Sequence, residues 1–442
     1  MGAVAGDYDG DGYVDLYVTN VGANTLYRNE AGKSLQDESA RAGVAHPGWS
    51  TSGAFLDHDA DGDLDLFVVN YLRWSQELEK QCFSEQGELD YCSPQSYDAP
   101  APDVLYANQG NGTFIDITEA AGLSKSFGNG LGVVACDLDG DARMDIYVAN
   151  DMMPNQLWKN GGDDTFEDIA LFAGCAANLD GASEASMGTA AIDIENDGDL
   201  DLFLTHLRDE TNTFYRNQSG VFTDRTNVLG LASPSRLFTG FGTGFGDFDQ
   251  DGVLDLYVAN GAVTRARQPH SPEDPYAEPN QLYRGSADSK GRVSFREVFP
   301  RGGLEGSPIR TSRGCALGDL DGDGDLDVLI VESQQAVTLL QNQTDSGHWL
   351  MLELIDGQRH AIGAKAKISA HEGNPSFAPL WRSVLPGTSY CSSHDPRLHF
   401  GLGEYTAKLD ATVHWADGAE ERFEALEVDQ VHRLVRSHRR AR

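Results

Sequence analysis

The chain lacks several features that would assign it at once to a broad class of protein. It contains no run of about 18 apolar residues, which excludes a hydrophobic membrane-spanning helix. No apolar segment of the secretory type follows Met1. Basic residues are few, with 33 Lys and Arg against 69 Asp and Glu, and the formal net charge of −36 argues against a nucleic-acid partner. Neither a Gly-x-Ser-x-Gly elbow nor a phosphate-binding glycine loop occurs, so no catalytic constellation is visible.

What the chain does contain is an acidic nine-residue pattern, Asp-x-Asp/Glu-x-Asp-Gly/Ala-x-x-Asp, which occurs six times. Carboxylates at positions 1, 3, 5 and 9, with the backbone carbonyl of position 7, form an oxygen-only ligand set that suits Ca²⁺. We therefore expect about one Ca²⁺ per loop, up to six in all. The predicted metal ligands are Asp7, Asp9, Asp11, Tyr13 and Asp15; Asp57, Asp59, Asp61, Asp63 and Asp65; Asp137, Asp139, Asp141, Arg143 and Asp145; Asp193, Glu195, Asp197, Asp199 and Asp201; Asp247, Asp249, Asp251, Val253 and Asp255; and Asp319, Asp321, Asp323, Asp325 and Asp327.

These loops differ from an EF-hand, which needs a bidentate Glu at position 12 and a helix on each side. Position 12 is apolar in every copy, as at Val18 and Ile330, and lies in an expected strand. The alternative is an acidic turn without a metal, but repulsion among four or five carboxylates makes six such turns unfavourable. Two copies carry the less common residue of the pattern, because Ala142 stands where the others have the turn glycine and Glu195 stands where the others have an aspartate.

Short strands surround each acidic loop. In the second copy a glycine-rich segment, 53–56, precedes the loop and an apolar segment, 66–70, follows it. A third and a fourth strand complete the unit, and four short strands per repeat predict the blade of a β-propeller. The pattern ends near Ser346. We predict an all-β chain with a propeller over residues 1–345, a β-sandwich over 346–437 and a basic tail at 438–442.

The acidic loops resemble the FG-GAP/VCBS calcium-loop repeats of integrin α-subunit propellers. The order of six repeats, a cysteine-bearing insert, and the tail stretches 395–403 and 413–418 is similar to the cartilage acidic protein family and its bacterial relatives, which end in an ASPIC/UnbV domain. That resemblance implies a seven-bladed, calcium-bound, integrin-α-like propeller packed on a transthyretin-like sandwich, in a secreted protein. Only six repeats are visible and Met1 falls inside the first one, so we expect that a first blade has been lost. A closed ring of six blades is the alternative.

The six cysteines divide into one close pair and four others. Cys82 and Cys92 lie near each other in a loop-like stretch and are the best candidates for a disulfide. Cys136 and Cys175 flank one repeat and are a second possible pair, whereas Cys315 and Cys391 either bridge two regions or stay free. Buried reduced thiols are the alternative for the last four. His394 and His399 lack a zinc-type ligand set and Arg397 is expected to pair with a carboxylate, so we expect structural roles for these three residues.

Strand order places all six acidic loops on one face of the propeller. The long insertions, 71–102 and 261–279, then lie on the opposite face, where loops on a rigid scaffold are most variable. Each candidate ligand-binding residue there has a simpler interpretation as a solvated loop residue. The candidates are Arg73, Trp74, Asp151, His206, Arg208 and Arg265.

Three functions are consistent with this layout. The first is an exported calcium-binding propeller, in the extracellular space, the periplasm or at the cell surface, that acts as a binding, adhesion or scaffold module for a protein or carbohydrate. The second is a propeller enzyme of the lyase or bond-forming type, which would need a deep pocket on the opposite face around His206 and Arg208. The third is a purely structural envelope protein that would assemble with itself in calcium.

Overall fold

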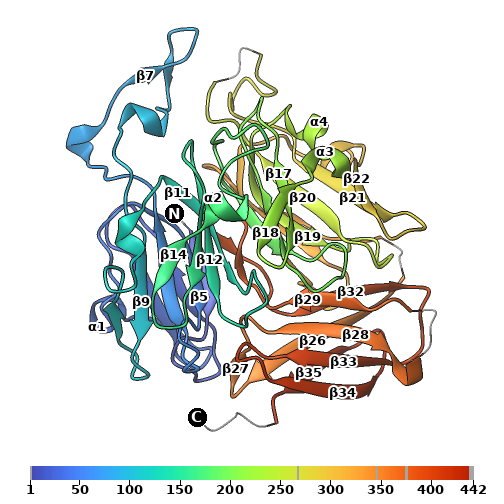
Figure 1. Cartoon of the computed structure of the whole chain (residues 1–442). Coiled ribbons are helices and arrows are strands. Elements are labelled where there is room, and N and C mark those ends of the chain that lie inside the picture. The colour runs from blue at the N-terminus through green and yellow to red at the C-terminus, as the bar shows by residue number, and fades with distance from the viewer. Residues whose placement is uncertain (1, 266–267, 345–346, 374–376, 438–442) are drawn as a thin grey trace.

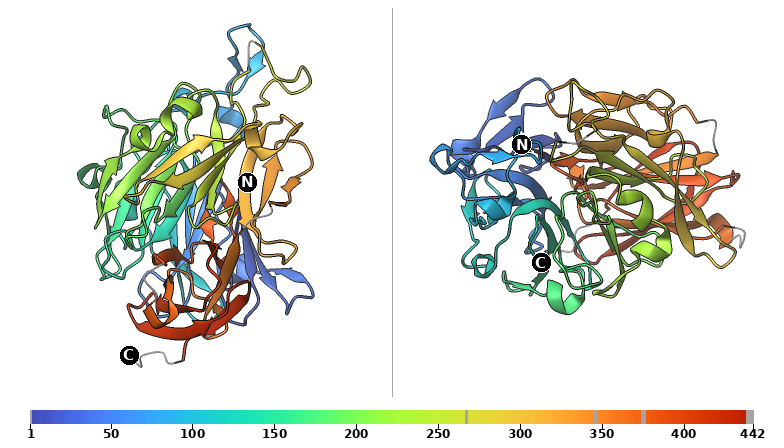
Figure 2. Two further views of the ribbon diagram at one scale, coloured as in Figure 1. Left: turned by 90° about the vertical axis from the view of Figure 1, so that its right-hand side faces the viewer. Right: turned by 90° about the horizontal axis from the view of Figure 1, so that it is seen from above.

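The computed structural model describes residues 2–265, 268–344, 347–373 and 377–437, and all its main elements are β-sheets. Six small antiparallel sheets surround a common axis, and a sandwich of two further sheets lies at one end (Figure 1). Seen from above, the chain passes around the axis from blue through green and yellow to orange (Figure 2, right). The predicted boundary at 345/346 and the predicted tail at 438–442 lie outside the described residues.

Each of the six sheets is one propeller blade, and the acidic loop joins its first two strands as predicted. The blades are β1 (Ala3–Gly6), β2 (Asp15–Val18), β3 (Thr25–Asn29) and β4 (Leu35–Asp37); β5 (Ser50–Leu56), β6 (Asp65–Asn70), β9 (Val104–Asn108) and β10 (Phe114–Asp116); β11 (Gly130–Cys136), β12 (Asp145–Asn150), β13 (Gln156–Asn160) and β14 (Phe166–Asp168); β15 (Thr189–Ile192), β16 (Asp201–Leu204), β17 (Thr213–Gln218) and β18 (Val221–Asp224); β19 (Gly240–Gly246), β20 (Asp255–Asn260), β21 (Gln281–Ala287) and β22 (Val293–Glu297); and β23 (Ser312–Gly318), β24 (Asp327–Glu332) and β25 (Thr338–Leu340).

The first strand of each blade lies closest to the axis, and glycine allows neighbouring first strands to approach one another. A Cβ atom on Gly132 would overlap the backbone carbonyl of Met187, and one on Gly188 would overlap the carbonyl of Phe241. Only glycine lets two backbones come this close. The glycine-rich character of these strands is therefore a consequence of ring packing.

Short helical turns follow several outer strands or lie in loops, and none of the described helices is long and apolar enough to cross a membrane. They are α1 (Ser39–Ala42), η1 (Gln76–Leu78), η2 (Pro94–Ser96), η3 (Leu123–Lys125), α2 (Ala170–Ala173), α3 (Thr226–Leu229), α4 (Ala232–Ser235), η4 (Arg301–Gly303) and η5 (His371–Gly373).

The C-terminal part is a sandwich, as predicted. Its core contains fully buried Leu352, Ile368, Phe400 and Val413. One sheet pairs β27 (Arg359–His360), β26 (His348–Asp356) and β32 (Leu398–Gly403), with β35 (Val431–Val435) parallel to β26. The other has the order β29 (Leu380–Ser383), β28 (Lys365–Ala370), β33 (Leu409–His414) and β34 (Glu420–Leu426).

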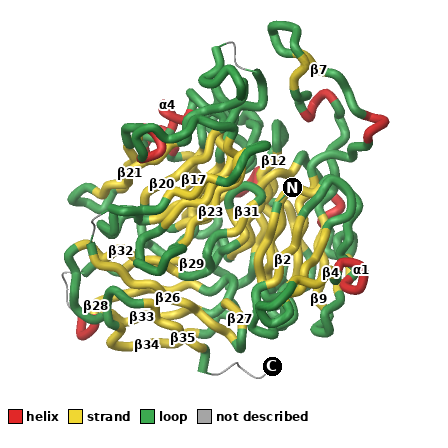
Figure 3. Tube along the Cα trace, turned by 180° about the vertical axis from the view of Figure 1, so that it is seen from behind, coloured by secondary structure: helices red, strands yellow, loops and turns green. Residues whose placement is uncertain are grey.

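A hairpin of the sandwich, β30 (Gly387–Thr388) and β31 (Ser392–Ser393), enters the axis of the propeller. The backbones of Ser389 and Thr189 exchange two hydrogen bonds of 3.0 and 2.6 Å, and the Cys391 carbonyl accepts a bond of 3.2 Å from the Ala3 amide. Strand β31 lies between β1 and β23 and joins the inner strands of the first and sixth blades (Figure 3). Within the described residues the ring thus consists of six blades and this hairpin.

The insertion between β6 and β9 projects from the end opposite the sandwich and contains β7 (Cys82–Phe83) and β8 (Leu89–Asp90) (Figure 1). The predicted disulfide between Cys82 and Cys92 is present. The other four cysteines are free thiols, so the suggested pairing of Cys136 with Cys175 is wrong.

Candidate metal centres and the opposite face

Each acidic loop is folded around the carboxylate at its first position. In the first loop Asp7 accepts backbone hydrogen bonds from Asp11 (3.1 Å) and Gly12 (2.8 Å). The bond from the sixth residue recurs in the other five loops. The bond from the fifth residue recurs in the third, fourth and fifth loops. Ala142 takes the left-handed conformation (φ 64°) that glycine takes at this position elsewhere, so the third loop keeps the same turn.

The carboxylate at position 9 fastens the loop to its own sheet. Asp15 accepts hydrogen bonds from the amides of Tyr8 (3.1 Å) and of Asn29 on the third strand (2.7 Å). The same pair of bonds is made by Asp65, Asp145, Asp255 and Asp327, whereas Asp201 keeps only the bond from the third strand. The sequence predicts metal binding at this position, and the hydrogen bonds in the structure show that the same carboxylate anchors the loop to the sheet.

Several loops bring together oxygen atoms of the kind that a hard cation binds. Carboxylate oxygens gather within 4.8 Å of one another in several loops, for example those of Asp7, Asp9 and Asp15. Buried oxygens without a hydrogen-bond partner occur on Asp9, Asp57, Glu195, Asp201 and Asp249, which a cation would satisfy.

The electrostatics of the loops agree with this interpretation. Burial, followed by repulsion from the neighbouring carboxylates of the loop, raises the pKa of Asp57 to about 7. Burial also raises the pKa of Asp145 to about 7, with a smaller contribution from the carboxylates of Asp139 and Asp141. The pKa of Asp255 is raised to about 8 by the same causes. A bound divalent cation would favour the ionised form of each carboxylate.

Four loops have a basic side chain from the third strand against their carboxylates. Arg28 lies 3.0 Å from Asp11, and Lys159 contacts Asp139 in the third loop. The other two pairs are Arg216 with Glu195 and Arg284 with Asp251. Ala107 and Gln341 stand at the equivalent positions of the second and sixth loops, so these two loops have five carboxylates and no basic residue there.

An asparagine at the end of the third strand links consecutive loops. The Nδ2 group of Asn108 donates to the carbonyl of Leu64 in its own loop and to that of Tyr8 in the preceding one, both at 2.9 Å. In the fifth blade the position of this asparagine is occupied by Gly285, where a Cβ atom would overlap the backbone carbonyl of Leu254. A link to the preceding loop also occurs at Asn160, Asn217 and Asn342.

The sandwich covers the face that carries the acidic loops. Trp381 donates its backbone N–H to Asn196 (2.9 Å), His399 donates Nε2–H to the Gly324 carbonyl (2.9 Å), and Arg359 lies 3.7 Å from Asp63. The amide of Gly403 donates to the carbonyl of Gln250 at 2.7 Å. Sequence reasoning did not anticipate that the loops form a platform for the second domain.

A cavity of about 120 Å³ remains between the two domains and is lined by Arg382, His394, Arg397 and His399, among others. Burial lowers the pKa of both histidines to about 4, so they are neutral. Arg397 pairs with Asp395, as expected for a structural residue. The predicted structural roles of these three residues agree with the contacts they make.

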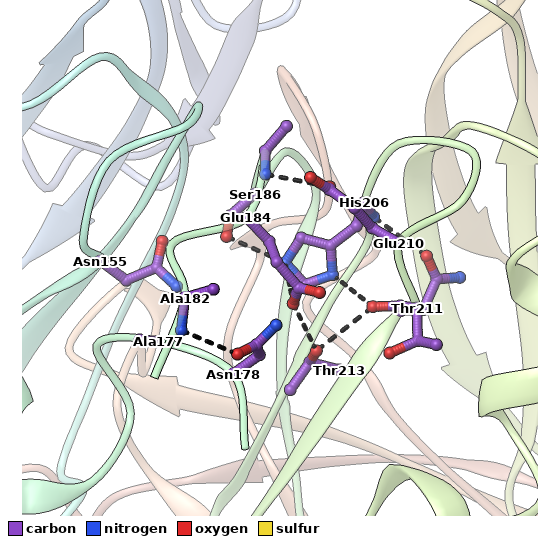
Figure 4. Close-up of polar contacts among 12 residues, drawn as sticks. Asn155, Ala177, Asn178, Ala182, Glu184, Ser186, His206, Glu210, Thr211 and Thr213 are labelled. Atoms are coloured by element: carbon purple, nitrogen blue, oxygen red, sulfur yellow. Dashed lines mark hydrogen bonds and ion pairs between the residues drawn. The ribbon is translucent and has the colours of Figure 1, made fainter. Parts of the chain in front are cut away.

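On the opposite face, His206 is a buried structural residue and not an open catalytic group. Its Nδ1–H donates to the Thr211 carbonyl (2.8 Å) and its Nε2 accepts from the Ser186 hydroxyl (3.0 Å) (Figure 4). Glu184 lies 3.8 Å from Nε2, and burial lowers the pKa of His206 to about 4. The residue is 1% exposed. Neither ring nitrogen is available to a ligand.

The remaining predicted residues of that face also make internal contacts. Arg208 pairs with buried Glu278, and Asp151 accepts a hydrogen bond from the Tyr71 hydroxyl (2.7 Å). Trp74 packs edge-on against Trp49, with ring centres 5.8 Å apart. Arg73 lies 5.4 Å from the ring centre of Phe127.

The two insertions meet over the end of the axis. Asp90 accepts hydrogen bonds from the Arg265 amide (2.9 Å) and the Tyr276 hydroxyl (3.0 Å), and Arg265 also pairs with Glu88 (2.7 Å). We call this structure the arch. A polar cavity of about 450 Å³ adjoins it, lined by Tyr91, Tyr276 and Arg313 among others. Of its lining residues only Arg265 was a sequence candidate, because tyrosines in a loop carry no recognisable pattern.

Comparison with known proteins fits these loops and this two-part architecture. The model of the FG-GAP-like repeat family matches residues 7–68, 87–148, 137–204 and 193–258, which together exceed half of the chain. The chain belongs to the FG-GAP-like repeat family. The model named ASPIC and UnbV matches residues 355–441, the sandwich region.

Curated relatives of this FG-GAP-like protein include cartilage acidic protein 1. The human protein is 26% identical over 439 residues, which is 95% of this chain and 60% of the relative, and the Mus musculus protein is 25% identical. The chain thus spans about three fifths of the length of these relatives. Solved structures include an Agrocybe aegerita lectin (15% identity, 78% and 81% of the two chains, TM-score 0.42) and the rhamnogalacturonan lyase YesX (12%, 78% and 72%, TM-score 0.33).

Proposed function

We propose that this FG-GAP-like protein is an exported, calcium-stabilised propeller that binds a protein or carbohydrate through the face opposite its acidic loops. The observation that carries the proposal is the distribution of surfaces. The sandwich covers the loop face and its hairpin fills the axis, which leaves the face with the two insertions open. A ligand site on the open face would use loops held on a rigid scaffold.

Calcium has a structural role in this proposal. The first, third, fifth and ninth residues of each loop, with the backbone carbonyl of the seventh, would hold the ion, which would neutralise the carboxylates. In the first, second, fourth and fifth loops the ion would also satisfy buried carboxylate oxygens that otherwise lack partners. Because the loops also contact the sandwich, neutralisation would stabilise the domain interface as well. The disulfide between Cys82 and Cys92 fits an oxidising compartment outside the cytosol, where calcium is plentiful.

The binding module is favoured over the enzyme by the state of the opposite face. An enzyme would need His206 and Arg208 to converge on a deep pocket. Instead His206 is sealed by Ser186 and Thr211, and Arg208 is paired with Glu278.

Thermal unfolding with and without calcium tests the proposal. If each of six sites has a Kd of about 0.1 mM, 1 mM Ca²⁺ adds about 1.4 kcal/mol per site, or about 8 kcal/mol in total. The expected result is a large rise in Tm in calcium relative to EDTA. Asp57→Asn should reduce that rise, whereas Asp180→Asn, at an exposed position outside the loops, should not. An equal Tm in calcium and in EDTA would contradict the proposal.

A further inference from the structure

The cavity beside the arch has the features of a built ligand site. It is lined by Tyr91 from the first insertion, Arg265 and Tyr276 from the second, Arg313 from β23, and Gln334 and Gln335 from the turn after β24. Four separate segments thus converge on one cavity of about 450 Å³, within the range of small-ligand sites.

The walls of this cavity are held in place before any ligand arrives. Asp274 accepts hydrogen bonds from the Thr311 hydroxyl (2.7 Å) and amide (3.2 Å), which fixes the second insertion to the sixth blade. Asp90 binds the two insertions together, and the disulfide closes the loop that presents Tyr91. Preorganised walls lower the entropy cost of binding.

Arg313 supplies a positive charge, and its guanidinium contacts an aromatic ring and backbone carbonyls of the described residues. Its guanidinium stacks on Phe241 at 4.0 Å and donates to the carbonyls of Gly261 (2.9 Å), Ser312 (2.8 Å) and Ala262 (2.9 Å). These bonds use three of the five guanidinium hydrogens, so two remain for a ligand. Within the described residues Arg313 makes no direct ion pair with a carboxylate, and Glu278 and Asp274 attract its charge only from a greater distance. A ligand carboxylate would complete this site.

The other walls suit a ligand rich in hydroxyl groups. The rings of Tyr91 and Tyr276 lie 5.3 Å apart, and Tyr91 is 58% exposed, so it offers an aromatic face to the C–H groups of a sugar ring. Gln334, Gln335 and Glu273 provide amide and carboxylate groups that hydrogen-bond to hydroxyls.

We propose that this cavity binds a short saccharide that carries a carboxylate, with Arg313 pairing with the carboxylate and Tyr91 stacking on the sugar ring. The inference rests on the proposed binding function and specifies its ligand. The net charge of −36 repels long polyanions, so the site takes a short oligosaccharide or the end of a chain.

The test is calorimetric titration of the full chain in calcium. The acidic probes are trigalacturonate and a hyaluronan tetrasaccharide, and the neutral probes are galactotriose and chitotetraose. The expected result is that at least one acidic probe binds about tenfold or more tightly than its neutral counterpart, as a charge-assisted pair predicts. Arg313→Gln should remove this preference. Tyr91→Ala, at an exposed position, should weaken binding without lowering Tm.

The matched control is Arg292→Gln, because Arg292 is an exposed arginine that pairs with Asp288 away from the cavity, and it should leave both affinities unchanged. Equal binding of acidic and neutral probes, or an unchanged preference in a folded Arg313→Gln variant, would overturn the inference. Absence of saccharide binding in a chain that calcium still stabilises contradicts this inference alone. Absence of calcium stabilisation contradicts the proposed function.

Discussion

Replacing Gly401 by alanine should loosen the contact between the sandwich and the fifth acidic loop. A Cβ atom at Gly401 would lie 2.6 Å from Cγ of Asp247 and 2.6 Å from Cα of Gln250. Ordinary contact distances are about 3.5–4.0 Å, so strand β32 or the loop must move by about 1 Å. The backbone of Gly401 belongs to a strand, where alanine by itself is better tolerated than glycine. Any loss of stability therefore reports on the interface.

Overpacking of this size costs about 1–3 kcal/mol, which corresponds to a fall in Tm of several degrees. The assay is calorimetric unfolding in 1 mM Ca²⁺, combined with a count of bound calcium. The control is Gly357→Ala, in a turn of the same domain with no atom within 4 Å, where only the left-handed conformation (φ 67°) is penalised. Gly401→Ala should lose more stability than the control and should weaken calcium binding at the fifth loop. Wild-type stability and calcium content in Gly401→Ala would refute this account of the interface.

Three further predictions concern the loops. Asn217→Leu should cost about 2–4 kcal/mol because it leaves two buried carbonyls of neighbouring loops unpaired, whereas Asn29→Leu, which breaks two exposed bonds, should cost no more than about 1 kcal/mol in urea unfolding. Lys159→Met should tighten calcium binding at the third loop severalfold in equilibrium dialysis, because it removes an ammonium group that competes for the carboxylates. The pKa of Asp57 and the pKa of Asp145 are each raised from 3.8 to about 7 in the folded chain. At pH values between 3.8 and about 7, the calcium-free folded chain therefore binds more protons than the unfolded chain. Its stability should therefore fall as pH rises from 5 to 8, and the calcium-induced rise in Tm should grow; a constant rise would contradict the shifts.

Local patterns in the sequence were sufficient to predict the blades. The Asp7–Asp15 spacing determines both the loop and the strand that follows it, since the bonds from Gly12 and Tyr8 close within a few residues. The disulfide between Cys82 and Cys92 could also be predicted, because the two cysteines are only 10 residues apart in the sequence.

Contacts between distant segments could not be predicted in this way. Ser389 pairs with Thr189 on another domain, and Tyr276 meets Asp90 across the ring, yet neither pair leaves a periodic signal. The prediction for His206 failed in a different way. Its residue type suggested a ligand-binding site, whereas in the structure both ring nitrogens are hydrogen-bonded inside the core. A polar residue is informative about function only when its partners are known.

Anomalous X-ray diffraction from crystals grown in millimolar calcium tests the central claim most directly. The account predicts a peak of anomalous density from calcium within each of the six acidic loops, on the face of the propeller that the sandwich covers. The loops begin at Asp7, Asp57, Asp137, Asp193, Asp247 and Asp319. Loops without anomalous density, with Arg28 and Lys159 paired to their carboxylates in place of an ion, would contradict it.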